Sequence, residues 1–510
     1  MVSRRSFIRL GATAAATAAA TAVGASGALP AVFAQAAAPD WAGLAGRLSG
    51  PLVLPSDTNY ATAKQIQWSQ FDSVNPAAIA YCRSAADVSA CLVFARANGL
   101  PATPRSGGHS FSGFSLGPGL VMDVSQINGV QLSGGTATVG GGALQIDVLN
   151  GLSGSGLALP GGLYPTVGSG GFIQGGGLGW ETRLLGMACD TLLSAQVVLA
   201  DGTVVTCSPK HDADLFWALR GGGGGNFGVV TSYSMAPTAV TTMTNFTLTW
   251  TWDQAADVLA GWQEWALDGP RQLSSGPAIA LFDAAAGNVP LVSVAGVWMG
   301  NPAAAGPLLD ALVALVGHAP ASRTSADFSY TNGMLNWYGC SNLTVSQCHR
   351  VGTTGDGQLG RFGWSLDRSR LFSDPLPTAG IDALLAAFDA NRTSGQSRFM
   401  RAIVLGGRAN DLGRTDTAYV HRDSQFIVSF DIGLPSATPS VSDQSAAQAW
   451  ATGGFNAVDP YSNRESYVNY LDPLLADWSS AYYAENYPRL QRVKACYDPT
   501  NFFRFAQSIN

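Results

Sequence analysis

Two glycine-rich segments hold the residues best suited to chemistry, because both can surround an anion with backbone N–H groups. The first, Pro104–Gly113, has the sequence PRSGGHSFSG and contains His109, and the second spans Thr166–Gly179. Glycine lets a backbone approach a ligand closely and adopt positive φ angles. We therefore expect Ser106–Ser110 and Thr166–Gly171 to bind a pyrophosphate. An ordinary tight loop is the alternative for either segment taken alone.

Two common nucleotide-binding motifs do not account for these segments. The chain has no GxxxxGK[ST] sequence, so a P-loop is absent. A GxGxxG motif runs from Gly223 to Gly228, but it follows a predicted helix and precedes a predicted strand. A Rossmann fingerprint requires the opposite order. The five histidines have no paired ligand spacing and no CxxC is present, so we predict no metal site.

Short strands and helices alternate around the glycine-rich segments, which predicts a mixed α+β domain over residues 37–238. Apolar and β-branched runs indicate the strands, and Asp201-Gly202 is a hairpin turn sequence. The predicted strands are 77–82, 120–124, 136–139, 192–199, 204–207 and 229–231, and the predicted helices are 85–99, 144–152 and 212–220.

A second α+β domain with an antiparallel sheet is predicted for residues 239–455, followed by a C-terminal segment over 456–510. Its predicted strands are 244–252, 291–299, 403–406 and 426–430, and its predicted helices are 255–267, 302–316 and 381–390. Near the C-terminus, Tyr482–Lys494 is predicted to form one helix.

Composition excludes several classes of protein. Of the 510 residues, 46% are hydrophobic and only 12% are charged, whereas an average soluble domain is about 25% charged. A disordered chain is therefore excluded. The formal net charge is −6, so no basic face for nucleic acid is expected.

The N-terminus has the pattern of a bacterial twin-arginine export signal over residues 1–36. Arg4-Arg5 precedes a weakly apolar run rich in Ala and Thr, which ends in Ala34-Gln35-Ala36. We expect a secreted or periplasmic protein without stable membrane insertion after cleavage. The alternative is an uncleaved membrane anchor, but Ala and Thr make a poor bilayer span.

Cysteine usage is compatible with export, because an oxidising compartment permits disulfides. Of seven cysteines, Cys340 and Cys348 lie in a polar segment and are the preferred pair. Cys91 lies in an apolar helix pattern and is expected in the core. Because seven is odd, at least one thiol is free if all pairing is internal.

The motif at 104–113 resembles the flavin-attachment loop of the berberine-bridge-enzyme-like oxidases, in the vanillyl-alcohol-oxidase/PCMH flavoprotein superfamily. The segments 160–179, 192–202, 214–231 and 482–509 extend the resemblance. It implies a two-domain PCMH-type FAD-binding fold, of class α+β, with an inserted substrate domain whose antiparallel sheet is covered by helices. It also implies an 8α bond from His109 to FAD. Further FAD contacts are implied at Arg105, Ser106, Gly107, Gly108, Ser110, Thr166, Val167, Gly168, Gly170, Gly171, Gly175, Gly176, Val230 and Asn501.

The sequence departs from that family at Tyr164, which occupies the position of a second, cysteinyl flavin link. A single covalent attachment through His109 is therefore expected. Val167 matches a position where a small side chain admits O2 to the flavin, which favours an oxidase over a dehydrogenase.

The sequence Tyr467-Val468-Asn469-Tyr470 resembles a family motif in which tyrosine is the base beside flavin N5. We assign that role to Tyr467, with Asn469 positioning it or the flavin, since on a strand the two residues would face the same side. A packing tyrosine is the alternative, and Tyr470 is the weaker candidate base. Ser429 takes the place of the family's Glu or Gln, and Asp431 is expected beyond the end of that strand.

Together these features predict a secreted FAD-dependent oxidase. It would oxidise an alcohol, in a sugar or a secondary metabolite, by hydride transfer to flavin N5, and O2 would reoxidise the flavin to give H2O2. The alternatives are a dehydrogenase with another acceptor and an exported flavin-carrying binding protein. The sequence specifies neither the substrate nor the oligomeric state.

Overall fold

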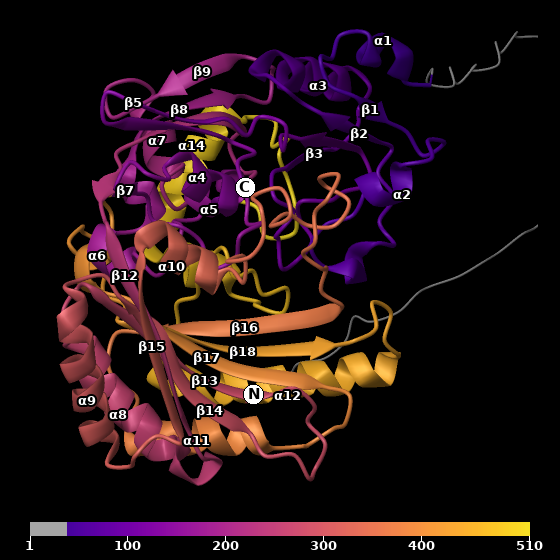
Figure 1. The fold of residues 1–510 in the computed structure, drawn as a ribbon. Coiled ribbons are helices and arrows are strands. Elements are labelled where there is room, and N and C mark those ends of the chain that lie inside the picture. The colour runs from indigo at the N-terminus through magenta and orange to yellow at the C-terminus, as the bar shows by residue number, and fades with distance from the viewer. Residues whose placement is uncertain (1–37) are drawn as a thin grey trace, which may run out of the picture. The chain divides into compact units, whose positions relative to one another are not determined.

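The computed structural model describes residues 38–510, and its strands form two small sheets, a short pair and one large sheet (Figure 1). The predicted export signal over 1–36 lies outside the described residues. Residues Trp41–Asn510 cluster into one unit, so both sheet systems belong to the same body. The domain boundaries proposed from the sequence stay a prediction.

A four-stranded sheet places the first glycine-rich segment. Its order is β1-β2-β4-β3, with β2, β4 and β3 parallel. The helix α3 connects β2 to β3, and Ser84 caps it by accepting a hydrogen bond from the Asp87 N–H. Residues 106–113 therefore leave the carboxyl end of β3. The bounds are α1 Trp41–Ala45, β1 Leu52–Val53, α2 Tyr60–Ala63, β2 Ala78–Tyr81, α3 Ala85–Ala97, β3 Ala102–Arg105 and β4 Leu120–Asp123.

A five-stranded antiparallel sheet, in the order β5-β6-β10-β8-β9, places the second glycine-rich segment. The predicted hairpin is present as β8 paired with β9. The bounds are β5 Val130–Ser133, β6 Thr136–Gly140, α4 Gln145–Gly151, α5 Ser169–Gln174, α6 Thr182–Leu185, β8 Leu192–Val198, β9 Val204–Cys207, α7 Ala213–Ala218 and β10 Val229–Met235. A short pair joins β7 Leu157–Ala158 to β11 Thr238–Ala239.

The large sheet has seven antiparallel strands in the order β15-β12-β14-β13-β17-β18-β16, which confirms the predicted antiparallel substrate-side sheet. The helices α8, α9, α11 and α12 cover one face of it (Figure 1). The bounds are β12 Thr242–Trp250, α8 Ala255–Leu267, β13 Leu273–Leu281, β14 Leu291–Trp298, α9 Ala305–Val316, β15 Ser322–Ser329, α10 Tyr330–Trp337, β16 Trp364–Phe372, α11 Thr378–Asp389, β17 Ser397–Val404, β18 Phe426–Leu434 and α12 Val441–Val458.

The two faces of this sheet differ in chemistry. Phe430 and Met400 face the helices and join an apolar core around Trp262. Because successive side chains of a strand alternate, Asp431 and Arg401 point to the opposite face, where both line a cavity. One face of the large sheet thus packs in the core, and the other presents polar groups to the cavity that the glycine-rich segments also line.

The C-terminal tail returns to the N-terminal half. The single helix predicted for Tyr482–Lys494 is wrong, because α13 Trp478–Tyr483 and α14 Tyr487–Tyr497 are separate helices. Ala484 has φ +39° between them, and Pro488 begins the second helix. The Lys494 ammonium donates hydrogen bonds to the carbonyl oxygens of Asn226 and Phe503, at 2.7 and 2.6 Å.

Among the helices of residues 38–510, none combines the length and the apolar character that crossing a bilayer requires.

Candidate active site

A cavity of about 1390 Å³ lies between the glycine-rich segments and the polar face of the large sheet. Its walls include five parts of the chain. They are the two glycine-rich segments, strands β16–β18, the turn at 467–471 and the tail at 502–507. The fold therefore joins the predicted cofactor site to the predicted catalytic motif in one space.

The two glycine-rich segments are pressed against each other at one wall of this cavity. A Cβ atom on Gly107 would stand 2.4 Å from the backbone N of Gly168, so no side chain is tolerated there. The backbone N–H groups of Gly107, Gly108 and His109 donate no hydrogen bond within the described residues. Unpaired N–H groups beside a cavity are a site for an anion such as a pyrophosphate.

His109 lies in the wall of this cavity beside two aromatic rings. Its ring centroid is 5.5 Å from that of Trp68 and 5.5 Å from that of Tyr164. Its Nε2 is 2.6 Å from Oγ1 of Thr166. Burial and, secondarily, the charge of Arg350 lower the pKa of His109 to about 3, so the imidazole is neutral at physiological pH.

Most residues assigned to the cofactor from the sequence do line the cavity. Four do not. Thr166 lies behind His109 and contacts its ring, Gly175 packs against Asn469, and Gly176 packs against Tyr419. Asn501 lines a separate depression of about 260 Å³. The predicted residues in the wall are Arg105, Ser106, Gly107, Gly108, His109, Ser110, Val167, Gly168, Gly170, Gly171 and Val230.

The catalytic motif is a turn, and the expectation that it lies on a strand is wrong. The Tyr470 N–H donates to the Tyr467 carbonyl at 2.9 Å, which closes the turn. Tyr467 and Asn469 nevertheless meet, because the Asn469 amide donates to the Tyr467 hydroxyl oxygen at 2.9 Å. That oxygen also accepts from the backbone N–H of Gly177 and of Leu178, at 2.8 and 3.1 Å. Tyr467 is only 2% exposed, and burial holds its pKa well above the usual range.

Tyr470 is the more open of the two tyrosines, and its hydroxyl makes no hydrogen bond within the described residues. Its ring packs edge-on against Phe111, with centroids 5.6 Å apart. Burial raises the pKa of Tyr470, and the positive charge of Arg401 acts in the opposite direction. Tyr470 therefore has the freedom to contact a ligand that Tyr467 lacks.

A polar cluster on the sheet faces Tyr470. Asp431 was expected beyond the end of its strand, but β18 continues to Leu434 and Asp431 lines the cavity. It pairs with Arg401, and across the strands it is in register with Asp367. Burial and, secondarily, the charge of Asp431 raise the pKa of Asp367, whereas the charge of Arg401 acts in the opposite direction. The cluster thus places two carboxyl groups and one guanidinium group on the cavity side of the sheet.

Aromatic rings form the remaining walls on the substrate side. Trp180 packs on Trp337 with ring centroids 4.6 Å apart, and Tyr164 lies 5.7 Å from Phe362. All four rings line the cavity. Flat apolar surfaces beside polar groups suit the faces of sugar rings or of aromatic metabolites.

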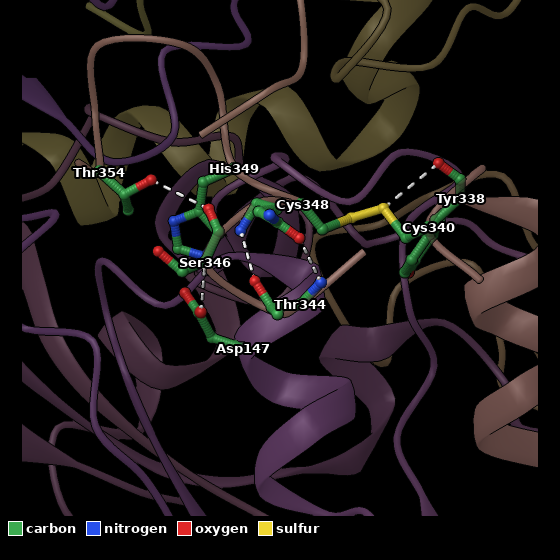
Figure 2. Close-up of a disulfide and its surroundings, with 9 residues drawn as sticks. Asp147, Tyr338, Cys340, Thr344, Ser346, Cys348, His349 and Thr354 are labelled. Carbon is green, nitrogen blue, oxygen red and sulfur yellow. Dashed lines mark hydrogen bonds and ion pairs between the residues drawn. A yellow bond between two sulfur atoms is a disulfide. The ribbon is translucent and has the colours of Figure 1, made fainter. Parts of the chain in front are cut away.

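The predicted disulfide between Cys340 and Cys348 is present (Figure 2). The segment that follows it reaches Phe362, which lines the cavity. Next to the disulfide, His349 contacts Asp147 at 3.0 Å, which ties this segment to α4. Cys91 is fully buried, as predicted.

A buried carboxyl group joins α10 to the loop before Tyr164. Glu181 is 0% exposed, and its Oε1 accepts a hydrogen bond from the Tyr330 hydroxyl at 2.6 Å. Its Oε2 accepts from the Gly161 N–H at 3.2 Å. No cation pairs with Glu181 within residues 38–510, and burial raises its pKa to about 7.

These features suit a large dinucleotide cofactor. The cavity is larger than the several hundred Å³ usual for small ligands. Unpaired backbone N–H groups can donate hydrogen bonds to a pyrophosphate. At Gly171 no atom occupies the space that a side chain would fill, so a ligand can approach the backbone there. Over residues 38–510, no three His, Cys, Asp or Glu side chains come together in an arrangement for a metal ion.

Comparison with known proteins identifies the fold as an FAD-binding one. The family model described as FAD binding domain matches residues 76–208, which contain both glycine-rich segments. The model described as berberine and berberine like matches residues 466–510, which contain the turn at 467–471 and the tail.

Relatives cover nearly the whole chain. An FAD-linked oxidoreductase of Bacillus subtilis (strain 168), YgaK, is 30% identical over 91% of this chain and 97% of its own. Glucooligosaccharide oxidase of Sarocladium strictum is 31% identical over 85% of this chain and 87% of its own. Among solved structures, a chitooligosaccharide oxidase is 26% identical with a TM-score of 0.81, covering 92% of this chain and 99% of its own. The chain belongs to the berberine bridge enzyme-like family of FAD-linked oxidoreductases, and FAD is its cofactor.

Proposed function

We propose that this enzyme is an oxidase that removes a hydride from an alcohol carbon of a neutral, hydroxyl-rich substrate and passes the electrons to O2. The observation that carries the proposal is one shared cavity, in which the glycine-rich FAD segments, a turn with a free tyrosine hydroxyl and a polar sheet face all form walls. Bound FAD supplies the hydride acceptor, and the chain supplies orientation and proton removal.

The flavin is held covalently through His109 alone in this proposal. His109 is neutral and lies in the cavity wall, so its imidazole is available as a nucleophile. Tyr164 lies beside it, at the position expected for a second link, and a phenol does not replace a thiolate in that reaction.

Tyr470 is the better placed base, and Tyr467 a positioning residue. The Tyr467 hydroxyl oxygen is already directed by three N–H groups, from Gly177, Leu178 and Asn469. It fixes the turn against the glycine-rich segment. Tyr470 has a free hydroxyl that can contact the substrate. Burial raises its pKa, and the positive charge of Arg401 opposes that rise, which favours the ionised form that acts as a base.

The chemistry of the walls and the relatives both support a sugar-type substrate. The paired rings Trp180 and Trp337 offer a stacking surface. The cluster of Asp367, Asp431 and Arg401 offers hydrogen-bond donors and acceptors to hydroxyl groups, and its two carboxyl groups disfavour anions. Two relatives are named glucooligosaccharide oxidase and xylooligosaccharide oxidase.

A peroxide screen tests the reaction. We expect H2O2 production with neutral mono- or oligosaccharides, and less with their uronic acid counterparts. Anaerobic reduction by the best substrate followed by mixing with air tests the acceptor. Rapid reoxidation is expected because Val167 leaves access beside the flavin segment, and slow reoxidation would make the enzyme a dehydrogenase.

We also propose export through the twin-arginine route to the periplasm or beyond. The Cys340–Cys348 disulfide supports an oxidising destination. Replacing Arg4 and Arg5 together by lysine should retain the precursor in the cytoplasm, as measured by cell fractionation. Unchanged export of that variant would contradict the proposed route.

A further inference from the structure

The two nitrogen atoms of His109 have different surroundings. Nε2 lies 2.6 Å from the Thr166 hydroxyl, whereas Nδ1 has no hydrogen-bond partner within the described residues. Nδ1 is also absent from the set of fully buried unpartnered atoms, so it opens on the cavity. Only one nitrogen is thus free to react with a group in that cavity.

The position of the proton on the neutral ring decides whether Nδ1 can react. A neutral imidazole carries one N–H, and only the other nitrogen has a lone pair to form a bond. With the proton on Nδ1, that N–H would face the cavity without an acceptor. With the proton on Nε2, it is donated to the Thr166 oxygen, and the Nδ1 lone pair is directed into the cavity.

We infer that Thr166 is a positioning residue for the covalent attachment of FAD, acting by holding the His109 proton on Nε2. The inference rests on the proposed link at His109. Thr166 is only 2% exposed, and its backbone packs against Gly107. The rings of Trp68 and Tyr164 pack beside the imidazole, each with its centroid 5.5 Å away, and restrict the rotation that would exchange the two nitrogens.

In the attachment of FAD to His109, a bond forms between Nδ1 and the 8α carbon. One C–H bond of that methyl group breaks, and the imidazole gives up its proton. The two protons and one electron pair reduce the flavin, and O2 then accepts them as H2O2. Thr166 takes part only by accepting the Nε2 hydrogen bond before the bond forms.

Two substitutions separate the hydroxyl from the shape of the side chain. Thr166→Val keeps the branched shape without the hydroxyl, and Thr166→Ser keeps the hydroxyl. Both are purified as holoproteins and incubated with added FAD. Covalent flavin is measured after acid denaturation, and NMR of the proteolytic flavopeptide identifies which nitrogen is bonded.

We expect Thr166→Ser to match the native protein, with flavin on Nδ1 only. Thr166→Val should attach flavin on the order of tenfold more slowly, since one hydrogen bond no longer selects the tautomer, and part of its flavin should be on Nε2. Native behaviour of Thr166→Val, or equal loss in both variants, would overturn the inference. Covalent flavin in His109→Ala would instead overturn the proposed link itself, which keeps the two failures distinct.

Discussion

Because Glu181 is buried without a cation, we predict that the enzyme loses stability as the pH rises. Its pKa is about 7 in the folded chain against 4.5 for an ordinary glutamate. The folded state therefore holds the proton more strongly than the unfolded state does. The resulting stabilisation is complete below about pH 4.5 and is lost as the pH rises to about 7.

The magnitude follows from that difference in pKa. The difference of about 2.5 between the two pKa values corresponds to about 3 kcal/mol of unfolding free energy, which is lost between about pH 4.5 and pH 7. For a chain of 510 residues the unfolding entropy is on the order of 1 kcal/mol/K, so the thermal midpoint should move by roughly 3 °C.

The assay compares the native enzyme with Glu181→Gln by scanning calorimetry between pH 4.5 and 8. The amide cannot titrate, so the variant lacks this one contribution, while all other groups contribute equally to both proteins. Gln also leaves the Gly161 N–H opposite an amide donor, which adds a cost that does not vary with pH. The difference between the two midpoints should therefore shrink by roughly 3 °C as the pH rises. Parallel curves would refute the argument that burial without a cation controls Glu181.

Three further predictions concern the site and its supporting segment. Tyr470→Phe should slow anaerobic flavin reduction by about 100-fold or more. Tyr467→Phe should mainly lower the thermal midpoint, because two backbone N–H groups lose their acceptor. Equal losses of rate in the two variants would contradict these separate roles. Arg401→Gln should move the pH–rate profile of flavin reduction to higher pH by about one unit, because loss of the cation raises the pKa of Tyr470 further; an unchanged profile would separate Arg401 from the base. Cys340→Ser opens a loop with a sequence separation of 8, which should cost about 2–3 kcal/mol and lower the midpoint measured by calorimetry; no change would mean that packing alone holds the segment.

Local patterns were sufficient where one physical effect dominated. The helix α8 was predicted with the observed bounds, because its apolar spacing matches a buried helical stripe. The β8–β9 hairpin followed from the Asp201-Gly202 turn. The prediction that helices cover one face of the large sheet came from the family resemblance and not from periodicity.

The sequence was less informative where a strand borders a cavity. Strand β18 was expected to stop near Phe430 because Asp431 and Gly433 interrupt its apolar run. In the structure, Asp431 and Gly433 lie on the cavity face of the strand. The alternation of polar and apolar residues, and not the apolar run alone, therefore predicts the full length of β18. The same alternation in β16 and β17 would have located Asp367 and Arg401, which sequence analysis missed.

Contacts between distant segments were beyond local reasoning. The three hydrogen bonds to the Tyr467 oxygen come partly from residues 177 and 178, nearly three hundred positions away. Asn501 was assigned to FAD, but its own positive φ directs the tail past a separate depression. The disulfide partners, by contrast, were identifiable because both lie close together in one polar segment.

The return of the tail to the N-terminal half has a consequence for biosynthesis. Ile509 is fully buried and its N–H donates to the Asn226 side chain at 3.0 Å. Phe503 and Gln507 form part of the cavity wall. The ribosome makes these wall residues long after both glycine-rich segments, so a nascent chain that ends before Phe503 has an incomplete cavity. Full enclosure of the nucleotide is therefore a late event in the biosynthesis of this protein.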